Sequence, residues 1–381
     1  MLKYFLFFLM FVSVSGYAQH TVTGKVIDKA DNKPIQFAVV FLNKTGIATN
    51  TLDNGTFTLK NIPEGHYQLL VTLVGYESIK LLIDVTGDLH LDDIILSAKT
   101  EDLKEVVIKE KFKLSPFYYL FRAEFLGASP LARQCKILNP EVIHFYDTDK
   151  QGDYSAKSDE FIEIQNEALG YNIKVLLTSF VKDHTTHITS YLGDSYYKEM
   201  KGTPAQEREW KENRMECYQG SMMQFLRAVI AGTTRQEGYK IKKATLDKNA
   251  FYDPIELFDD DMDDPYLYQI KDSLLNESDI LSRTNKPGLF ALNRGGTANT
   301  SALYVQFHEP ARVKADGKKE PRIPWIWQNT DCFILFEKPY AIFDYHGVID
   351  NTGDIKYSGF FGERCLSNQL PVDFDPSEQQ F

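Results

Sequence analysis

Residues 19–97 show the alternation of apolar and polar positions that is typical of half-buried strands. In 66-HYQLLVTLV-74, the side chains of Tyr67, Leu69, Val71 and Leu73 fall on one face of an extended chain. Burying a leucine or valine side chain stabilises a fold by roughly 1.5–3 kcal/mol, so this segment predicts a core strand. Six other short segments, rich in β-branched and aromatic residues, also read as strands: 21–28, 36–43, 46–50, 55–61, 78–85 and 89–96. Seven such strands predict an all-β sandwich.

Beyond residue 112 the pattern becomes mixed. The strand-like segments are 142–147, 161–166, 171–180 and 303–308, and 333–349 predicts two strands around a turn. Residues 112–381 therefore predict an α+β domain with mostly antiparallel strands.

One long helix is predicted near 205–231. Its apolar face consists of side chains that recur at helical spacing: Tyr218, Met222, Phe225, Leu226 and Val229. Pro204 suits the first turn and Gly232 an end. Gly220 in the middle weakens the helix prediction, and close packing at that point is one reason for a glycine there.

The N-terminus has the layout of a secretory signal peptide. Lys3 precedes the apolar stretch 4-YFLFFLMFVSV-14, which is too short to span a bilayer, and Gly16 and Ala18 supply small residues for cleavage after Ala18. Residues 1–18 are therefore expected to be removed, and no later segment of the sequence approaches a transmembrane span. We expect an exported protein that is soluble after cleavage, in the periplasm or associated with the outer membrane.

Composition bounds the class of partner and the redox chemistry. The chain is 43% hydrophobic and 25% charged, with a net charge of −11, which argues against a broad grip on nucleic acid or anionic lipid. An exported setting permits two disulfides among Cys135, Cys217, Cys332 and Cys365, with three connectivities. The wide spacings favour buried thiols instead.

Motifs in the first region resemble those of a known family. In order they are G-x-V-x-D at 24–28, P-I-x-F-A-x-V at 34–40, T-x-x-x-G-x-F-x-L at 51–59, I-P-x-G-x-Y-x-L at 62–69 and V-G-Y-E at 74–77. This order resembles the carboxypeptidase regulatory-like domain, which occurs in exported bacterial proteins. The resemblance implies a transthyretin-like (prealbumin-like) seven-strand sandwich over residues 19–97.

The polar junction 98-AKTEDLKEVVIKEK-111 resembles the segment that joins this module to the plug of TonB-dependent outer-membrane transporters. Residues 112–381 lack the serial amphipathic strands that a barrel needs, so the chain is not itself such a transporter. The resemblance implies an association with the outer membrane.

The second region also looks familiar. Its motifs resemble the downstream part of exported bacterial proteins that carry the same sandwich and have no assigned reaction; they are 125–140, 166–177, 191–200 and 210–229. In that family a His stands where this chain has Gln224, so no His-based role is expected at this position.

Known catalytic motifs are missing from the sequence. A zinc carboxypeptidase needs an H-x-x-E pair, and neither this pair nor H-E-x-x-H occurs. His184 and His187 form H-T-T-H within a predicted strand–turn–strand, where their spacing places the rings on opposite faces. No G-x-S-x-G elbow or phosphate-binding loop is present, and the acidic run 259–264 lacks the spacing of an EF-hand. We expect no catalytic residue, no metal site and no cofactor.

Two groups of side chains are candidate binding surfaces. Trp210, Arg214 and Tyr218 belong to residue types that are enriched in binding hot spots, although a helix packed on a sheet is the favoured interpretation. Trp325 and Trp327 alternate on an extended segment, where they would stack on a sugar or peptide or belong to a core strand.

The sequence thus favours a non-enzymatic envelope protein whose sandwich docks on an outer-membrane partner. Two alternatives stay open. One is an envelope hydrolase with an unrecognised site in 112–381, and the other is a carbohydrate- or peptide-binding module.

Overall fold

The computed structural model describes ten stretches of the chain: 19–99, 116–147, 153–182, 189–246, 268–295, 301–308, 331–350, 352–357, 359–362 and 365–379. By their contacts the residues divide into two compact units, Met1–Leu42 with Ile47–Asp102, and Asn43–Gly46 with Leu103–Phe381. The signal-peptide segment, His184, His187, the acidic run 259–264 and both Trp325 and Trp327 lie outside the described residues. No described helix is long and apolar enough to cross a membrane.

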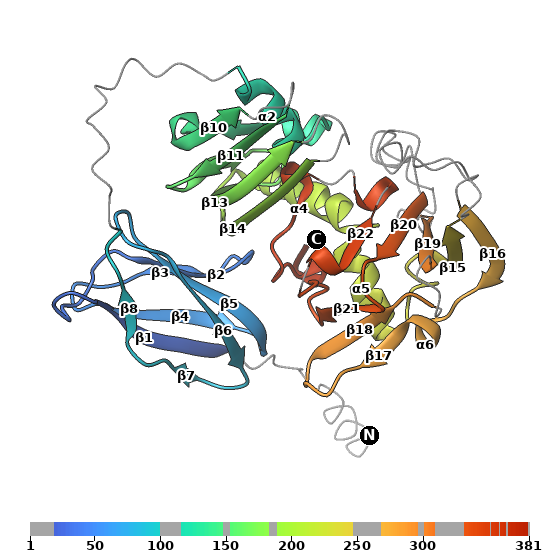
Figure 1. Ribbon diagram of the computed structural model, residues 1–381, viewed down its shortest axis with the longest axis horizontal. Helices are drawn as coiled ribbons and strands as arrows, with labels where there is room; N and C mark the ends of the chain where they lie inside the picture. The colour runs from blue at the N-terminus through green and yellow to red at the C-terminus, as the bar shows by residue number, and fades with distance from the viewer. Residues whose placement is uncertain are drawn as a thin grey trace, which may run out of the picture. The chain divides into compact units, whose positions relative to one another are not determined.

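The first unit is a β-sandwich of two sheets (Figure 1). One sheet centres on β1 (His20–Asp28), which pairs with β4 (Thr56–Ile62), β7 (Leu89–His90) and β8 (Ile94–Leu96). The other has the order β3 (Ala48–Asn50), β2 (Val39–Leu42), β5 (Gly65–Thr72) and β6 (Ile79–Val85). The prealbumin-like sandwich predicted from the sequence is confirmed, although the strand expected at 89–96 consists of two short pieces that both run parallel to β1.

The alternation in β5 builds the core of the sandwich, as predicted. Tyr67, Leu69 and Val71 are buried in one cluster with side chains from both sheets, and Leu73 packs against it. Gly55 has φ +75°, and a Cβ there would come within 2.6 Å of the Val26 carbonyl oxygen. Only glycine fits this turn without displacing the backbone.

The second unit begins with a six-stranded antiparallel sheet. Its strands are β9 (Cys135–Ile137), β10 (Ile143–Asp147), β11 (Tyr154–Ser158), β12 (Ile162–Asn166), β13 (Tyr171–Lys182) and β14 (Thr189–Glu199). Strands β13 and β14 form a long hairpin. Helices α2 (Tyr118–Leu126) and α3 (Pro130–Arg133) contribute Phe121, Phe125 and Leu131 to the core of this sheet.

The single long helix predicted near 205–231 is wrong in one respect, because two helices occupy this stretch. Helix α4 (Pro204–Tyr218) starts at a capping box formed by Thr203 and Gln206. Gly220 then adopts φ +67°, and the Ser221 side chain caps the start of α5 (Met222–Ala231). The glycine that was expected in mid-helix therefore marks a break. The first helix ends there because Gly220 adopts a left-handed backbone conformation, which glycine adopts more readily than other residues.

The remaining strands form two more antiparallel sheets. One has the order β16 (Tyr268–Leu274), β15 (Tyr239–Leu246), β19 (Ser301–Phe307), β20 (Asp331–Phe336) and β22 (Ile355–Tyr357). The other has the order β17 (Leu281–Arg283), β18 (Leu289–Asn293) and β21 (Tyr340–Asp344). Helix α6 (Glu277–Ile280) directly precedes β17 in the chain. Helix α5 shares a buried cluster with side chains of both sheets. The two strands predicted in 333–349 are present, but they belong to different sheets.

Short 3-10 helices lie before and after β22. They are η5 (Thr352–Asp354), η6 (Gly359–Phe361), η7 (Leu366–Asn368) and η8 (Pro376–Gln379), and η2 (Pro140–Val142) precedes β10. Leu366, Leu370 and Phe374 of the C-terminal segment lie in the same buried cluster as α2 and β13. This irregular segment is therefore part of the core of the second unit.

Candidate functional site

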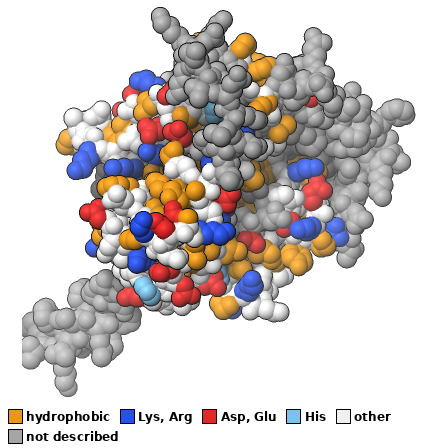
Figure 2. All heavy atoms as spheres, turned by 60° about the vertical axis from the view of Figure 1, so that its left-hand side comes forward, with side chains coloured by type: hydrophobic (Ala, Val, Ile, Leu, Met, Phe, Trp, Pro, Cys, Tyr) orange, Lys and Arg blue, Asp and Glu red, His pale blue; other side chains and the backbone are white. Residues whose placement is uncertain are grey.

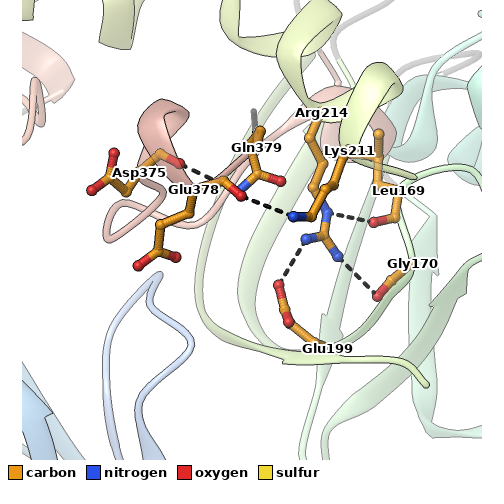
Figure 3. Close-up of polar contacts among 8 residues, drawn as sticks. All are labelled: Leu169, Gly170, Glu199, Lys211, Arg214, Asp375, Glu378 and Gln379. Atoms are coloured by element: carbon orange, nitrogen blue, oxygen red, sulfur yellow. Dashed lines mark hydrogen bonds and ion pairs between the residues drawn. The ribbon is translucent and has the colours of Figure 1, made fainter. Parts of the chain in front are cut away.

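The sequence motifs of the second unit converge on Arg214 of α4. Its Nε donates to the Leu169 carbonyl oxygen at 2.8 Å, and its Nη2 reaches the Gly170 carbonyl oxygen at 3.4 Å. Its Nη1 forms an ion pair with Glu199 at 2.7 Å (Figure 3). The guanidinium also lies 4.0 Å from the ring centre of Tyr171. Motifs 166–177, 191–200 and 210–229 therefore meet at one buried cation.

Trp210 lies one helical turn before Arg214 and contacts the same turn before β13. Its indole Nε1 donates to the Glu167 carbonyl oxygen at 2.8 Å. A Cβ at Gly170 would come within 2.2 Å of the indole, and one at Gly202 within 2.6 Å. The two glycines thus provide the space that the indole fills.

The C-terminal segment also packs against α4. Lys211 Nζ donates to the Glu378 carbonyl oxygen at 2.9 Å, and Gln379 Nε2 donates to the Asp375 carbonyl oxygen at 3.3 Å (Figure 3). The rings of Tyr218 and Phe374 lie 5.5 Å apart. Helix α4 therefore contacts both the β12–β14 region and the chain's last described turn.

Arg227 of α5 has a role like that of Arg214. Its three donor nitrogens reach three backbone carbonyl oxygens, those of His346 at 2.8 Å, Val372 at 2.9 Å and Phe374 at 2.9 Å. Irregular backbone leaves carbonyls without ladder partners, and the guanidinium fork satisfies them. The result is a link between α5, the turn after β21 and the C-terminal segment.

Burial shifts the pKa values of several titratable groups in the second unit. Desolvation, with Arg227 nearby, lowers the pKa of His346 to about 4, so this side chain is neutral at pH 7. Desolvation also raises the pKa of Asp373 and raises the pKa of Cys135 to about 12. Burial of a thiol in this way keeps it protonated and unreactive. The four cysteines, all within the described residues, are present as thiols.

The candidate binding residues of α4 are placed inside the second unit. Trp210, Arg214 and Tyr218 are buried, and each contacts another part of the same unit. The structure thus uses this trio to join α4 to its neighbours, and no exposed aromatic surface results. Within the described residues, no group of three or more His, Cys, Asp or Glu side chains is placed to hold a metal ion.

Gln224, at the position where a related pattern has His, is also engaged internally. Its Oε1 accepts from the Gly220 N–H at 2.6 Å and from the Tyr239 hydroxyl at 2.9 Å. Its Nε2 donates to Glu237 at 2.8 Å. The Gln224 carboxamide therefore connects the break between α4 and α5 to β15 by hydrogen bonds.

Glu199 and Asn213 were missed by the sequence reasoning. Glu199 pairs with Arg214, and Asn213 Nδ2 donates to the Ala168 carbonyl oxygen at 2.8 Å. One signal was available, because motif 191–200 contains Glu199 as its last residue but one and motif 210–229 contains Arg214. Opposite charges in two motifs of one domain suggest a pair.

The sandwich offers a surface of another kind. Among the described strands, β6 pairs only with β5, so its other edge has no strand beside it. Leu82 at the middle of β6 is 82% exposed, between the exposed Lys80 and Asp84. Asp84 also contacts His66 of β5. On the face drawn in Figure 2, acidic, basic and apolar side chains are intermingled over the described surface.

The fold defines a chain with an N-terminal β-sandwich and an α+β second unit. Residues 22–108 match the model of the CarboxypepD_reg-like domain family, a regulatory and non-catalytic module. No curated protein matches the chain.

Solved structures show similarity over part of the chain. A type II cohesin–X-dockerin complex from Acetivibrio cellulolyticus is 22% identical with TM-score 0.20, and the match covers 21% of this chain and 58% of that chain. The group B streptococcus pilus 2b backbone protein is 18% identical with TM-score 0.19, covering 21% and 42%. A DUF3823 family protein from Parabacteroides merdae is 11% identical with TM-score 0.17, covering 46% and 80%. The chain thus spans less than two thirds of the first two structures.

Proposed function

We propose that this chain is a non-enzymatic, exported cell-envelope protein whose β-sandwich is an adaptor that docks on an outer-membrane protein. The observation that carries the proposal is the open edge of β6, beside which no described strand lies. The CarboxypepD_reg-like match of residues 22–108 supports a non-catalytic role for this unit. In this scheme the second unit is what the adaptor presents.

An open edge offers backbone donors and acceptors to an incoming strand. Adding a strand gives affinity through main-chain hydrogen bonds, while side chains at alternate positions give specificity. On β6 the exposed face has Lys80, Leu82 and Asp84 in alternation. Charged side chains on an edge discourage indiscriminate pairing, so a suitable partner strand has a pattern that complements one basic, one apolar and one acidic position.

The internal hydrogen bonds of polar side chains in the second unit support the non-enzymatic part of the proposal. Arg214, Arg227 and Gln224 have the functional groups that active sites use, yet each contacts backbone or side-chain groups of its own unit. A group occupied in this way is unavailable to a substrate.

Photo-crosslinking in native envelopes tests the proposal. A photoreactive amino acid at Lys80 or Asp84 is expected to give one discrete outer-membrane adduct, to be identified by mass spectrometry. Leu82→Lys, which places an extra charge on the edge, is expected to abolish the adduct, whereas Leu138→Lys at an exposed position of the second unit is not. Absence of any outer-membrane adduct, together with turnover of an envelope peptide or glycan by the purified chain, would overturn the proposal in favour of a hydrolase.

A further inference from the structure

Three large apolar side chains are exposed at one end of the sandwich. The last cross-strand row at this end of β3, β2 and β5 consists of Asn50, Val39 and Thr72, which are paired in register. Two residues beyond that row, on the same three chain segments, are Leu52, Phe37 and Val74. Their exposed fractions are 64%, 61% and 73%. We call these three side chains the apolar row.

Phe37 is held in a backbone conformation that disfavours an aromatic residue. Its φ is +60°, a region in which bulky side chains are rare and strained. The surroundings enforce it, because the Phe37 N–H donates to the Thr51 carbonyl oxygen at 3.0 Å and the Ala38 N–H donates to Thr51 Oγ1 at 2.9 Å. A strained residue with its ring in solvent adds nothing to the core, and strain of this kind is concentrated at functional sites.

We propose that the apolar row is a docking surface for a short polypeptide segment of a partner protein, with an apolar centre and basic flanks. The proposal rests on the proposed function of the sandwich as an adaptor and adds a surface separate from the β6 edge. A stable pair of subunits buries about 800 Å² on each partner, far more than three side chains provide. The area therefore fits one short segment better than a second copy of this chain.

The charges around the row favour a protein with basic flanks over a lipid surface. Asp53 directly follows Leu52, and Glu77 lies three residues after Val74. Asp28 is close to the same turn, since it accepts the hydroxyl hydrogen bond of Tyr76 at 2.6 Å. The bases near this end are Lys99, whose N–H donates to the Gly75 carbonyl oxygen, and Lys29 and Lys33 in the turn after Asp28. Lys33 pairs with Asp31 at 2.6 Å. The exposed acids Asp53 and Glu77, close in sequence to Leu52 and Val74, repel anionic lipid and attract Lys or Arg.

Selection from a random peptide library displayed on phage tests the surface, with the full mature chain as bait. Enriched peptides are expected to have two or three apolar residues flanked by Lys or Arg. Phe37→Gly is the informative variant because glycine tolerates φ +60°, so the variant loses the ring without loss of folding. We expect at least about tenfold weaker binding of the enriched peptides, with a melting temperature that is unchanged or higher.

One control variant and two further assays separate the alternatives. Leu82→Ser removes an equally exposed side chain elsewhere on the sandwich and is expected to leave peptide affinity unchanged. Enriched peptides that bind Phe37→Gly and Val74→Ser as tightly as the parent chain, or a library that yields no apolar–basic consensus, would overturn the inference. Co-sedimentation of the chain with phosphatidylglycerol vesicles, lost in Val74→Ser, would overturn it in favour of a membrane. Concentration-dependent dimerisation lost in Val74→Ser would do so in favour of a second copy. The Leu82→Lys crosslinking result is independent of all these, so either proposal can fail alone.

Discussion

The side chains considered as candidate binding residues have opposite surroundings in the two units. In the sandwich, Phe37 and Leu82 expose most of their surface, whereas Trp210, Arg214 and Arg227 of the second unit contact their own chain. Residue types that are typical of binding hot spots therefore lie inside the unit in which the sequence suggested a surface. The exposed candidates are aliphatic and phenyl side chains in the unit that the sequence analysis expected to dock on a partner, although it named no binding residue there.

Backbone satisfaction explains this difference. The sandwich strands pair along most of their length, so few carbonyls need a side-chain donor. The second unit has irregular backbone before β13 and after residue 364, and its carbonyls at Leu169, Val372 and Phe374 accept from arginine. A buried carbonyl without a partner costs free energy, and a guanidinium with five donors satisfies several at once.

The largest expected effect is that of Trp210→Ala. Removing the indole leaves a cavity against Gly170 and Gly202 and deletes the hydrogen bond to the Glu167 carbonyl. We expect the free energy of unfolding of the second unit to fall by about 4 kcal/mol, as for other buried tryptophans. Urea denaturation followed by hydrogen exchange of the β13 amides measures it. Leu82→Ala in the sandwich is the matched exposed control, and an equal loss in both variants would remove the contrast between the units.

Arg227→Ala is expected to be the next most damaging. It leaves three carbonyls, on two chain segments, without their donor. Hydrogen bonds that involve a charged group contribute about 1.5–3 kcal/mol each, and bonds made by one side chain do not add fully. We expect a loss of about 3 kcal/mol and faster exchange of amides in the C-terminal segment. Arg235, which makes one exposed bond to Asn276, is the control, and Arg235→Ala should cost under about 0.5 kcal/mol. Similar losses for both arginines would contradict the structural role of Arg227.

Protonation of His346 makes the second unit sensitive to acid. Its pKa is lowered to about 4 in the folded chain from 6.5. Above pH 6.5 the ring is neutral in both states and has no effect. As the pH falls from 6.5 to 4 the unfolded chain binds the proton first, so stability declines by up to about 3 kcal/mol and levels off below pH 4. Denaturation midpoints of the parent and His346→Gln across this range isolate the histidine, and parallel pH profiles would show that it does not contribute.

Local sequence patterns predicted local structure well, but they predicted contacts between distant segments of the chain poorly. The alternation Tyr67, Leu69, Val71 sufficed for β5 because its period of two is set by the pleat alone. Gly220 was recognised as a weak point, yet a break depends on what packs nearby, here Gln224 bonded to the Gly220 N–H. The joint between Arg214 and Glu199 spans two motifs, and sequence spacing does not reveal which distant carbonyls face a helix.

The smallest expected effect is the change in stability caused by Phe37→Gly. It distinguishes backbone strain from side-chain packing in the sandwich. Phe37 and Asn61 both have φ +60°. Asparagine tolerates this region far better than an aromatic residue, so relief of strain by glycine should differ between the two positions. We expect Phe37→Gly to raise the stability of the sandwich by about 1 kcal/mol and Asn61→Gly to change it by only a few tenths. Hydrogen exchange of the β5 amides in the full chain reports this unit separately from the second. A fall in stability for Phe37→Gly would mean that the exposed ring contributes to folding, and the apolar row would then lose its argument from strain.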